Sequence, residues 1–126
     1  MTIGVYYSSW VDGGSSISTV DADIIFLAFA NPATQYSKAY SFEGTGLDLQ
    51  DFERCRQRIK DVRDRGGKVM LSVGGATYPF PDGLKTGNLW RLCRNLGCDG
   101  IDIDWEPSGG VDEDYKFGPI IQSFYE

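Results

Sequence analysis

The sequence predicts an α/β protein with about four parallel strands and helices between them, and two observations support this. Short apolar segments rich in β-branched and aromatic residues recur at 3–10, 23–32, 68–76 and 100–106. Two of the intervening segments carry apolar residues every three or four positions, as amphipathic helices do. Strand, crossover and strand in series give parallel neighbours with right-handed connections, either in a doubly wound sheet or in a (β/α)₈ barrel.

The first half of the chain contains two of these strands. Segment 3–10 ends at a turn rich in glycine and serine, and the crossover 11–22 is too short and polar to predict a helix. The run 23–32 is almost continuously apolar and closes with proline, which indicates a strand buried on both faces. A polar loop that contains Tyr36 and Tyr40 follows it.

The second half alternates helix and strand. Asp48 is predicted to cap a helix that ends at Gly66 and Gly67. Its apolar positions are Leu49, Phe52, Cys55, Ile59 and Val62. A strand over 68–76, a short helix over 89–96 and a strand over 100–106 follow, and a further helix begins within 115–126.

Composition and charge narrow the function classes. The 126 residues, 41% of them hydrophobic and 24% charged, are enough for one domain with a core. A net charge of -6 argues against nucleic acid or an anionic membrane as a partner, because both require basic patches. No apolar run approaches the roughly 20 residues of a membrane span. The first ten residues show no basic and then apolar leader, so we expect no signal peptide in this chain.

The absence of histidine limits the chemistry. Without histidine, and with three cysteines that form no C-x-x-C, the sequence lacks the usual zinc sites and serine–histidine triads. Acid–base catalysis would therefore use carboxylates, tyrosine or lysine, and we expect neither a metal nor an organic cofactor. Cys55 and Cys93 occupy apolar helix positions, where a thiol behaves as a small hydrophobic group.

Three acids alternate along the last strand, in the segment GCDGIDIDWEP (97–107). Asp102, Asp104 and Glu106 point to one face at steps of about 6.6 Å, and the apolar residues between them point to the other. In a barrel the acidic face looks inward, with Glu106 nearest the C-terminal mouth, where barrel enzymes place catalytic groups. Carboxylates this close share protons, so Glu106 is a candidate general acid. A solvated surface strand and a magnesium or calcium site are the alternatives.

Several segments resemble glycoside hydrolase family 18, the chitinase family. DGIDIDWE (99–106) is similar to the family pattern D-x-x-D-x-D-x-E, and LSVGGA (71–76) resembles its S-x-G-G on the third strand. VYYSSW (5–10) and IIFLAFA (24–30) resemble its first two strands. Since a (β/α)₈ barrel needs about 250 residues, the resemblance implies that residues 1–126 form the N-terminal half of the catalytic domain, a half-barrel.

The resemblance also implies roles for individual residues. Glu106 would donate a proton to the glycosidic oxygen, Asp104 would orient the substrate's acetamido group, and Asp102 would share the proton of Asp104. In this family the N-acetyl oxygen of the substrate is the nucleophile, so no second catalytic carboxylate is required.

A further set of residues would support these acids or bind the sugar. It comprises Tyr6 and Ser72 as hydrogen-bonding partners of the aspartates, Gly74 and Gly75 at a tight turn, Asp99 in a structural position, and the aromatic platforms Trp10, Tyr78 and Phe80.

The function implied is hydrolysis of chitin or chito-oligosaccharides, which are β-1,4-linked N-acetylglucosamine polymers, with retention of configuration. The alternatives are a chitin-binding, lectin-like module and an inactive truncated fragment of a chitinase. A second copy of the chain, or a missing C-terminal half, would have to complete the barrel. The family resemblance implies an extracellular location, although no leader is visible.

Overall fold

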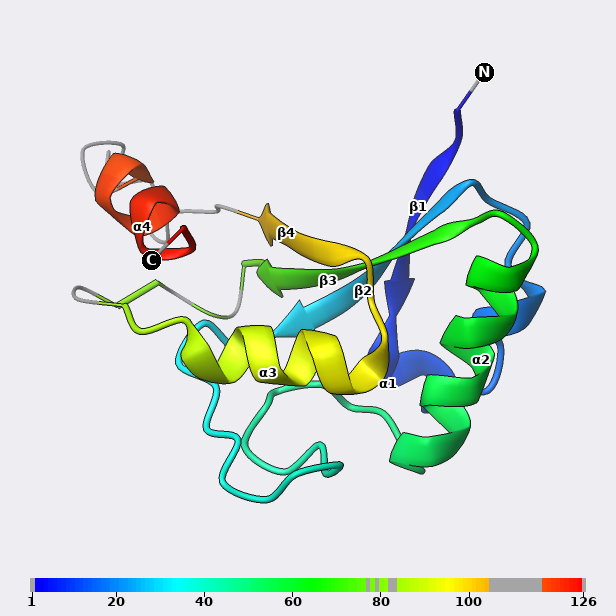
Figure 1. The fold of residues 1–126 in the computed structure, drawn as a ribbon, viewed down its shortest axis with the longest axis horizontal. Helices are drawn as coiled ribbons and strands as arrows, with labels where there is room; N and C mark the ends of the chain where they lie inside the picture. Colours follow the sequence, from blue (N-terminus) through cyan, green and yellow to red (C-terminus); the bar gives the residue numbers. More distant parts are fainter. Residues whose placement is uncertain (1, 77, 79, 82–83, 105–116, 126) are drawn as a thin grey trace.

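The fold is a single parallel sheet with helices between its strands, seen in a computed structural model that describes residues 2–76, 78, 80–81, 84–104 and 117–125 (Figure 1). The strands are β1 (Gly4–Ser8), β2 (Ile24–Ala30), β3 (Lys68–Gly74) and β4 (Gly100–Asp104). Within the described residues the sheet has the order β1-β2-β3-β4, and every neighbouring pair is parallel. This confirms the predicted α/β class.

The crossovers differ in length and content. The first holds only the single-turn α1 (Ser9–Asp12) and the 3₁₀ turn η1 (Ile17–Thr19). The second and third carry the longer helices α2 (Phe52–Asp64) and α3 (Gly87–Leu96), and α4 (Phe117–Ser123) follows β4. Figure 1 shows α2 and α3 on the same side of the sheet. None of the helices in the described part of the chain is long and apolar enough to cross a membrane.

The hydrophobic core lies between the sheet and the helices α2 and α3. On the sheet side it contains Ile25, Leu27, Ala30, Val69, Leu71 and Val73, and on the helix side Cys55, Ile59, Val62, Leu89, Leu92 and Leu96. The alternate positions of β4, Ile101 and Ile103, pack against the same core, as the period of two predicts. The other face of β4 therefore carries its two aspartates.

Several predicted boundaries were wrong. β2 and β3 end at Ala30 and Gly74, two residues before the predicted ends at 32 and 76. β1 ends at Ser8 because α1 begins at the next residue, so Trp10 lies on a helical turn and not on a strand. Helix α2 begins at Phe52, and its N-cap is Asp51, whose carboxylate accepts a hydrogen bond from the Arg54 amide at 3.2 Å. Leu49 is 93% buried although it precedes the helix. Leu49 thus keeps the spacing of buried helix positions although it lies in the loop before α2, and this is why the sequence predicted an earlier start for the helix.

The loop between β2 and α2 was predicted to be polar, but it contains a buried tyrosine. Tyr36 is 1% exposed, and its hydroxyl accepts hydrogen bonds from Asn95 Nδ2 and from the Tyr40 amide, both at 2.8 Å. The guanidinium of Arg91 lies 5.3 Å from the centre of its ring. These contacts attach the loop to α3, because they satisfy the one polar atom of a buried aromatic side chain.

Tyr7 ties β1 to the turn after it. Its hydroxyl donates a hydrogen bond to the Asp12 carboxylate and accepts one from the Ser16 amide at 3.2 Å. Burial, and then the hydrogen bond to Asp12, raise the pKa of Tyr7 from 10.0 to about 12. The folded protein therefore holds this proton more tightly than the unfolded chain does.

We expect the free energy of unfolding to fall as the pH rises from about 10 through about 12, because the phenolate is favoured only after unfolding. Urea titrations at several pH values measure this loss. Tyr7→Phe should cost about 1 kcal/mol at neutral pH and show a smaller loss over the alkaline range. Equal alkaline losses in the two proteins would contradict the assignment to Tyr7.

Candidate active site on the concave face of the sheet

Asp102 receives two hydroxyl hydrogen bonds on the same carboxylate oxygen. Its Oδ2 accepts from Ser72 Oγ at 2.8 Å and from Tyr6 Oη at 3.2 Å. Ser72 is fully buried and lies directly opposite Asp102 in the register of β3 and β4. The carboxylate of Asp102 is therefore held in one orientation by donors from two other strands.

The hydrogen bond between Tyr6 and Asp102 requires a curved sheet. Tyr6 is on the first strand and Asp102 on the fourth, and three strand spacings of a flat sheet would separate them by about 14 Å. The two side chains nevertheless touch, so the sheet curls toward the face that they share, as in a barrel. We call this face the concave face.

Tyr6 acts as a donor at neutral pH. Burial, and then the negative charge of Asp102 and its hydrogen bond, raise the pKa of Tyr6, with a smaller effect from Asp104. The phenol therefore keeps its proton, although the side chain is 53% exposed.

Asp104 lies on the same face at the carboxyl end of β4, opposite Gly74. Its backbone carbonyl accepts a hydrogen bond from the Gly75 amide at 3.1 Å. A Cβ atom added to Gly74 would lie 2.3 Å from that carbonyl oxygen, and the φ angle there is +111°. Only glycine permits this approach, which fixes the end of β3 against the end of β4.

Aromatic rings border the acids on the concave face. The Tyr6 ring stacks on Phe26 with ring centres 5.0 Å apart, and Trp10 stacks on Phe29 at 6.2 Å. Phe26 and Phe29 are half-buried, so the prediction that β2 is buried on both faces was wrong for this chain. The reason is that α2 and α3 both cover the opposite face (Figure 1).

Phe26 and Phe29 were not among the residues singled out from the sequence. Phe26 pairs with Tyr6 in the register of β1 and β2, so its place beside a predicted site residue was the available signal.

Asp99 lies at the other end of β4. Its carboxylate accepts a hydrogen bond from the Val69 amide at 2.8 Å and forms an ion pair with Arg63 Nε at 3.1 Å. Asp104 is five residues further along the chain, or about 16 Å in an extended strand. The structure thus does not bring Asp99 together with the other two aspartates, and its contacts fix where β4 begins.

Two further predicted site residues, Tyr78 and Phe80, lie in the segment between β3 and α3. The Tyr78 hydroxyl donates a hydrogen bond to the Gly46 carbonyl at 3.3 Å, so this ring belongs with the loop before α2. Phe80 is buried beside Gly74. Glu106, the predicted acid, lies outside the described residues.

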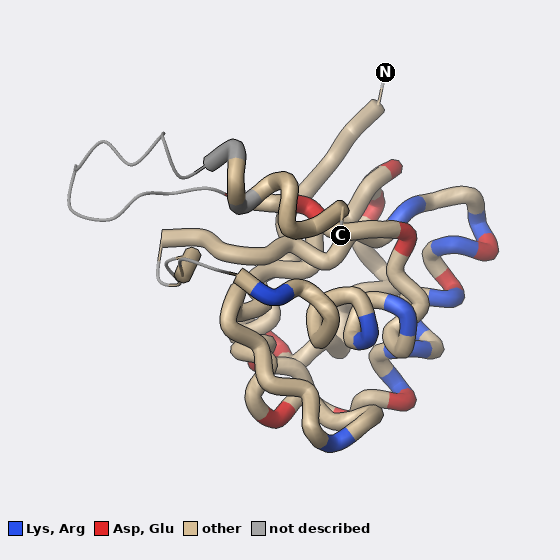
Figure 2. The backbone as a smooth tube through the Cα atoms, turned by 60° about the vertical axis from the view of Figure 1, so that its left-hand side comes forward, with Lys and Arg blue, Asp and Glu red and all other residues tan. Residues whose placement is uncertain are grey.

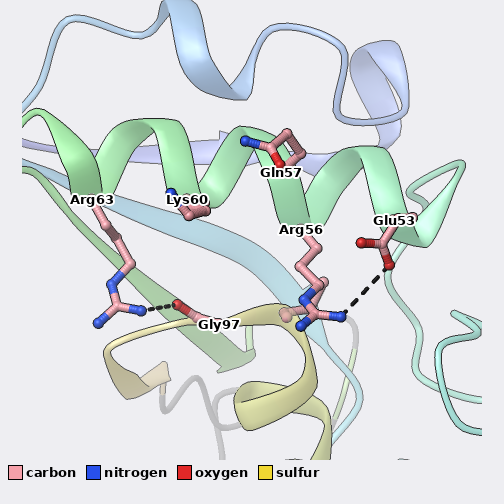
Figure 3. Close-up of a pocket in the computed structure, with 7 residues that line it drawn as sticks. Glu53, Arg56, Gln57, Lys60, Arg63 and Gly97 are labelled. Carbon is pink, nitrogen blue, oxygen red and sulfur yellow. Dashed lines mark hydrogen bonds and ion pairs between the residues drawn. The ribbon is translucent and has the colours of Figure 1, made fainter.

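The charged side chains are distributed unevenly. Lys and Arg gather along α2 and α3 (Figure 2), whereas the concave face carries Asp102 and Asp104. A groove of about 330 Å³ runs between α2 and the turn after α3 (Figure 3). Its cations are engaged: Arg56 pairs with Glu53 at 3.6 Å, and Arg63 donates to the Gly97 carbonyl at 2.9 Å. We therefore place the candidate site on the concave face.

Among the described residues, no group of three or more acids, cysteines or histidines is arranged to hold a metal ion.

A curved sheet of parallel strands, with acids at the carboxyl end of its fourth strand, defines the class of half-barrel α/β proteins. The family model of the glycosyl hydrolases family 18 matches residues 2–126. The chain belongs to this family.

Relatives and solved structures agree with this assignment. The chain is 27% identical over 123 residues to a chitinase of Plasmodium falciparum, a match that covers 85% of this chain and 32% of that protein. It is 23% identical over 106 residues to a probable chitinase, LysM11, of Penicillium expansum, covering 78% of this chain and 10% of that one.

The structure is similar to the putative chitinase A of Streptomyces coelicolor, with a TM-score of 0.65 at 20% identity over 97% of this chain and 44% of that one. It also resembles a family 18 chitinase of Pseudoalteromonas aurantia, with a TM-score of 0.54 at 20% identity over 86% and 43% of the two chains. The chain thus spans less than half the length of these proteins, and its half-barrel matches part of their fold.

We expect Gly74→Ala to lower the free energy of unfolding by about 1–3 kcal/mol, because alanine is strained at this φ and its Cβ would meet the Asp104 carbonyl. Urea unfolding measures the loss. Gly87→Ala is the matched control, since an added Cβ there meets nothing within 4 Å, and it should change stability by less than about 1 kcal/mol. Similar values for the two variants would show that the close approach of β3 and β4 is not required.

Proposed function

We propose that this protein acts as a chitinase-type glycoside hydrolase, which cleaves β-1,4-linked N-acetylglucosamine polymers by a substrate-assisted, retaining mechanism. The observation that carries the proposal is the pair of hydroxyl hydrogen bonds on Asp102, on the concave face and two residues from Asp104. The chain continues from Asp104 to Glu106, the last acid of D-x-x-D-x-D-x-E. The family membership and the chitinase relatives support the same reaction.

In the first step Glu106 donates its proton to the glycosidic oxygen, and the bond between that oxygen and the anomeric carbon breaks. The carbonyl oxygen of the substrate's N-acetyl group attacks the anomeric carbon from the opposite side, so a cyclic intermediate replaces the enzyme-bound sugar ester of other retaining enzymes. Asp104 accepts a hydrogen bond from the acetamido N–H and stabilises the positive charge that develops on the ring.

In the second step water attacks the anomeric carbon, the bond between that carbon and the acetamido oxygen breaks, and Glu106, now ionised, takes a proton from the water. Two inversions at the same carbon give net retention. Tyr6 and Ser72 do not touch the sugar in this scheme. They position Asp102, which lies two residues from Asp104 on the same face of β4.

We also propose that residues 1–126 form the N-terminal half of a chitinase-type (β/α)₈ catalytic domain. The chain covers 44% of the similar Streptomyces coelicolor structure, and a closed barrel requires about eight strands. The other strands of the barrel would come from more of the same polypeptide or from a second copy of this chain. Turnover per chain rises with protein concentration if a second copy supplies it, and stays constant if it does not.

We expect Glu106→Gln to lower the rate of cleavage of a chromogenic chito-oligosaccharide by about 10²–10⁴-fold, because glutamine cannot donate a proton. The circular dichroism spectrum should remain unchanged. Glu43→Gln is the matched control: this glutamate is exposed on a loop, and the variant should keep the activity of the unmodified chain. Comparable turnover by Glu106→Gln and Glu43→Gln would remove Glu106 from the mechanism.

A second candidate function is binding of chitin without cleavage, and the exposed aromatic rings of the concave face favour it. Trp10 is 57% exposed and Tyr6 53%, although both rings stack on phenylalanines of β2. Flat rings held this way offer surfaces on which pyranose rings can pack.

For this binding function we expect Trp10→Ala to weaken retention on chitin beads by about 1 kcal/mol, roughly fivefold in Kd. The neighbouring Val11→Ala should bind as the unmodified chain does, because Val11 is 73% exposed and carries no ring. Retention with no release of reducing ends indicates a binding module. Equal retention of both variants would exclude Trp10 as a sugar platform.

A further inference from the structure

The turn between α3 and β4 brings two cysteines together. Gly97 has φ +80°, and its amide donates to the Arg94 carbonyl, while the Cys98 amide donates to the Cys93 carbonyl, each at 3.1 Å. This is the Schellman motif, in which the residues that flank the turn on either side also bring their side chains into contact. In this chain both of those residues are cysteines, and both are reduced.

The backbone around Cys98 is held from both sides by one arginine. Arg63, from α2, donates to the Gly97 carbonyl at 2.9 Å and forms an ion pair with Asp99 at 3.1 Å (Figure 3 shows the contact with Gly97). Cys98 is thus fixed in place before any bond to it forms. A disulfide requires Cα atoms about 4.4–6.8 Å apart, and a direct backbone hydrogen bond between the two residues holds them close enough.

Cys93 Sγ donates to the carbonyl oxygens of Cys98 and Gly100 at 3.9 and 3.6 Å, so this thiol lies against the turn. Its interaction with the Cys98 thiol lowers the pKa of Cys93 and raises the pKa of Cys98 well above its usual value. Cys93 is 3% exposed and Cys98 is half-buried, so Cys98 is the more exposed residue of the pair. The third cysteine, Cys55, lies under the turn at Gly14, with its sulfur 3.2 Å from the Gln50 carbonyl oxygen.

We propose that Cys93 and Cys98 form a reversible disulfide that fastens the start of β4 to the end of α3. The bond would close a ring of only a few residues across a turn that is already formed. It would restrain a strand whose only partner in the described sheet is β3, and this strand carries Asp102 and Asp104.

The oxidant is a small disulfide such as glutathione disulfide. One of the two protein thiolates attacks one of its sulfurs, which forms a mixed disulfide and releases one glutathione thiolate. The other protein thiolate then attacks the protein sulfur of this mixed disulfide and releases the second glutathione. The two protein thiols lose two protons and two electrons in all, and one glutathione disulfide becomes two molecules of glutathione.

The test equilibrates the full chain in glutathione buffers of increasing oxidised fraction, blocks free thiols under denaturing conditions, and digests with trypsin. Cleavage after Arg94 places Cys93 and Cys98 on different peptides, so the bond joins two peptides and a reductant separates them. Hydrogen exchange of residues 100–104 in the reduced and oxidised protein then shows whether β4 is restrained.

The unmodified chain and Cys55→Ala should both yield the linked peptides, and Cys93→Ser and Cys98→Ser should not. Amide exchange in β4 should slow by about tenfold or more on oxidation and recover on reduction. The proposal is overturned if oxidation gives only glutathione adducts or links involving Cys55, or if the internal bond forms and exchange in β4 stays the same.

Discussion

The hydrogen bonds that Asp102 accepts from Tyr6 and Ser72 are the contacts on which the concave face depends. They join the first, third and fourth strands through side chains, whereas backbone pairing joins only neighbours. The Tyr6 hydroxyl of β1 can reach Asp102 only if the sheet is curved. The orientation of the Asp102 carboxylate therefore depends on the curvature of the sheet. A flatter sheet would leave Asp102 with one donor in place of two.

The two faces of the sheet are specialised because a strand alternates its side chains. The aliphatic positions of β2 and β3 meet α2 and α3 and supply the core, and Ile101 and Ile103 extend it to β4. The positions between them carry the acids, the hydroxyls and the stacked rings. Gly74 allows the ends of β3 and β4 to approach closely. The backbone contact between these ends then fixes the position of Asp104, the last residue of β4.

Sequence patterns predicted the alternation of strands and helices and the shared face of Asp102 and Asp104, since both follow from simple periods. The pairing of Ser72 with Asp102 follows once the strands are parallel neighbours. The contact of Tyr6 with Asp102 does not, because periodicity carries no information about curvature. The start of α2 was missed for a related reason: Leu49 is buried by the loop around it, and burial by tertiary contacts imitates the spacing of a helix.

Within the described sheet, β1 and β4 each pair on one side only, beside a face rich in aromatic rings. Open edges of this kind accept any extended segment that reaches them, whether or not it is the intended neighbour. An edge that stays uncovered while the chain folds is therefore a site where aggregation can begin, and chaperones that shield strand edges would reduce it.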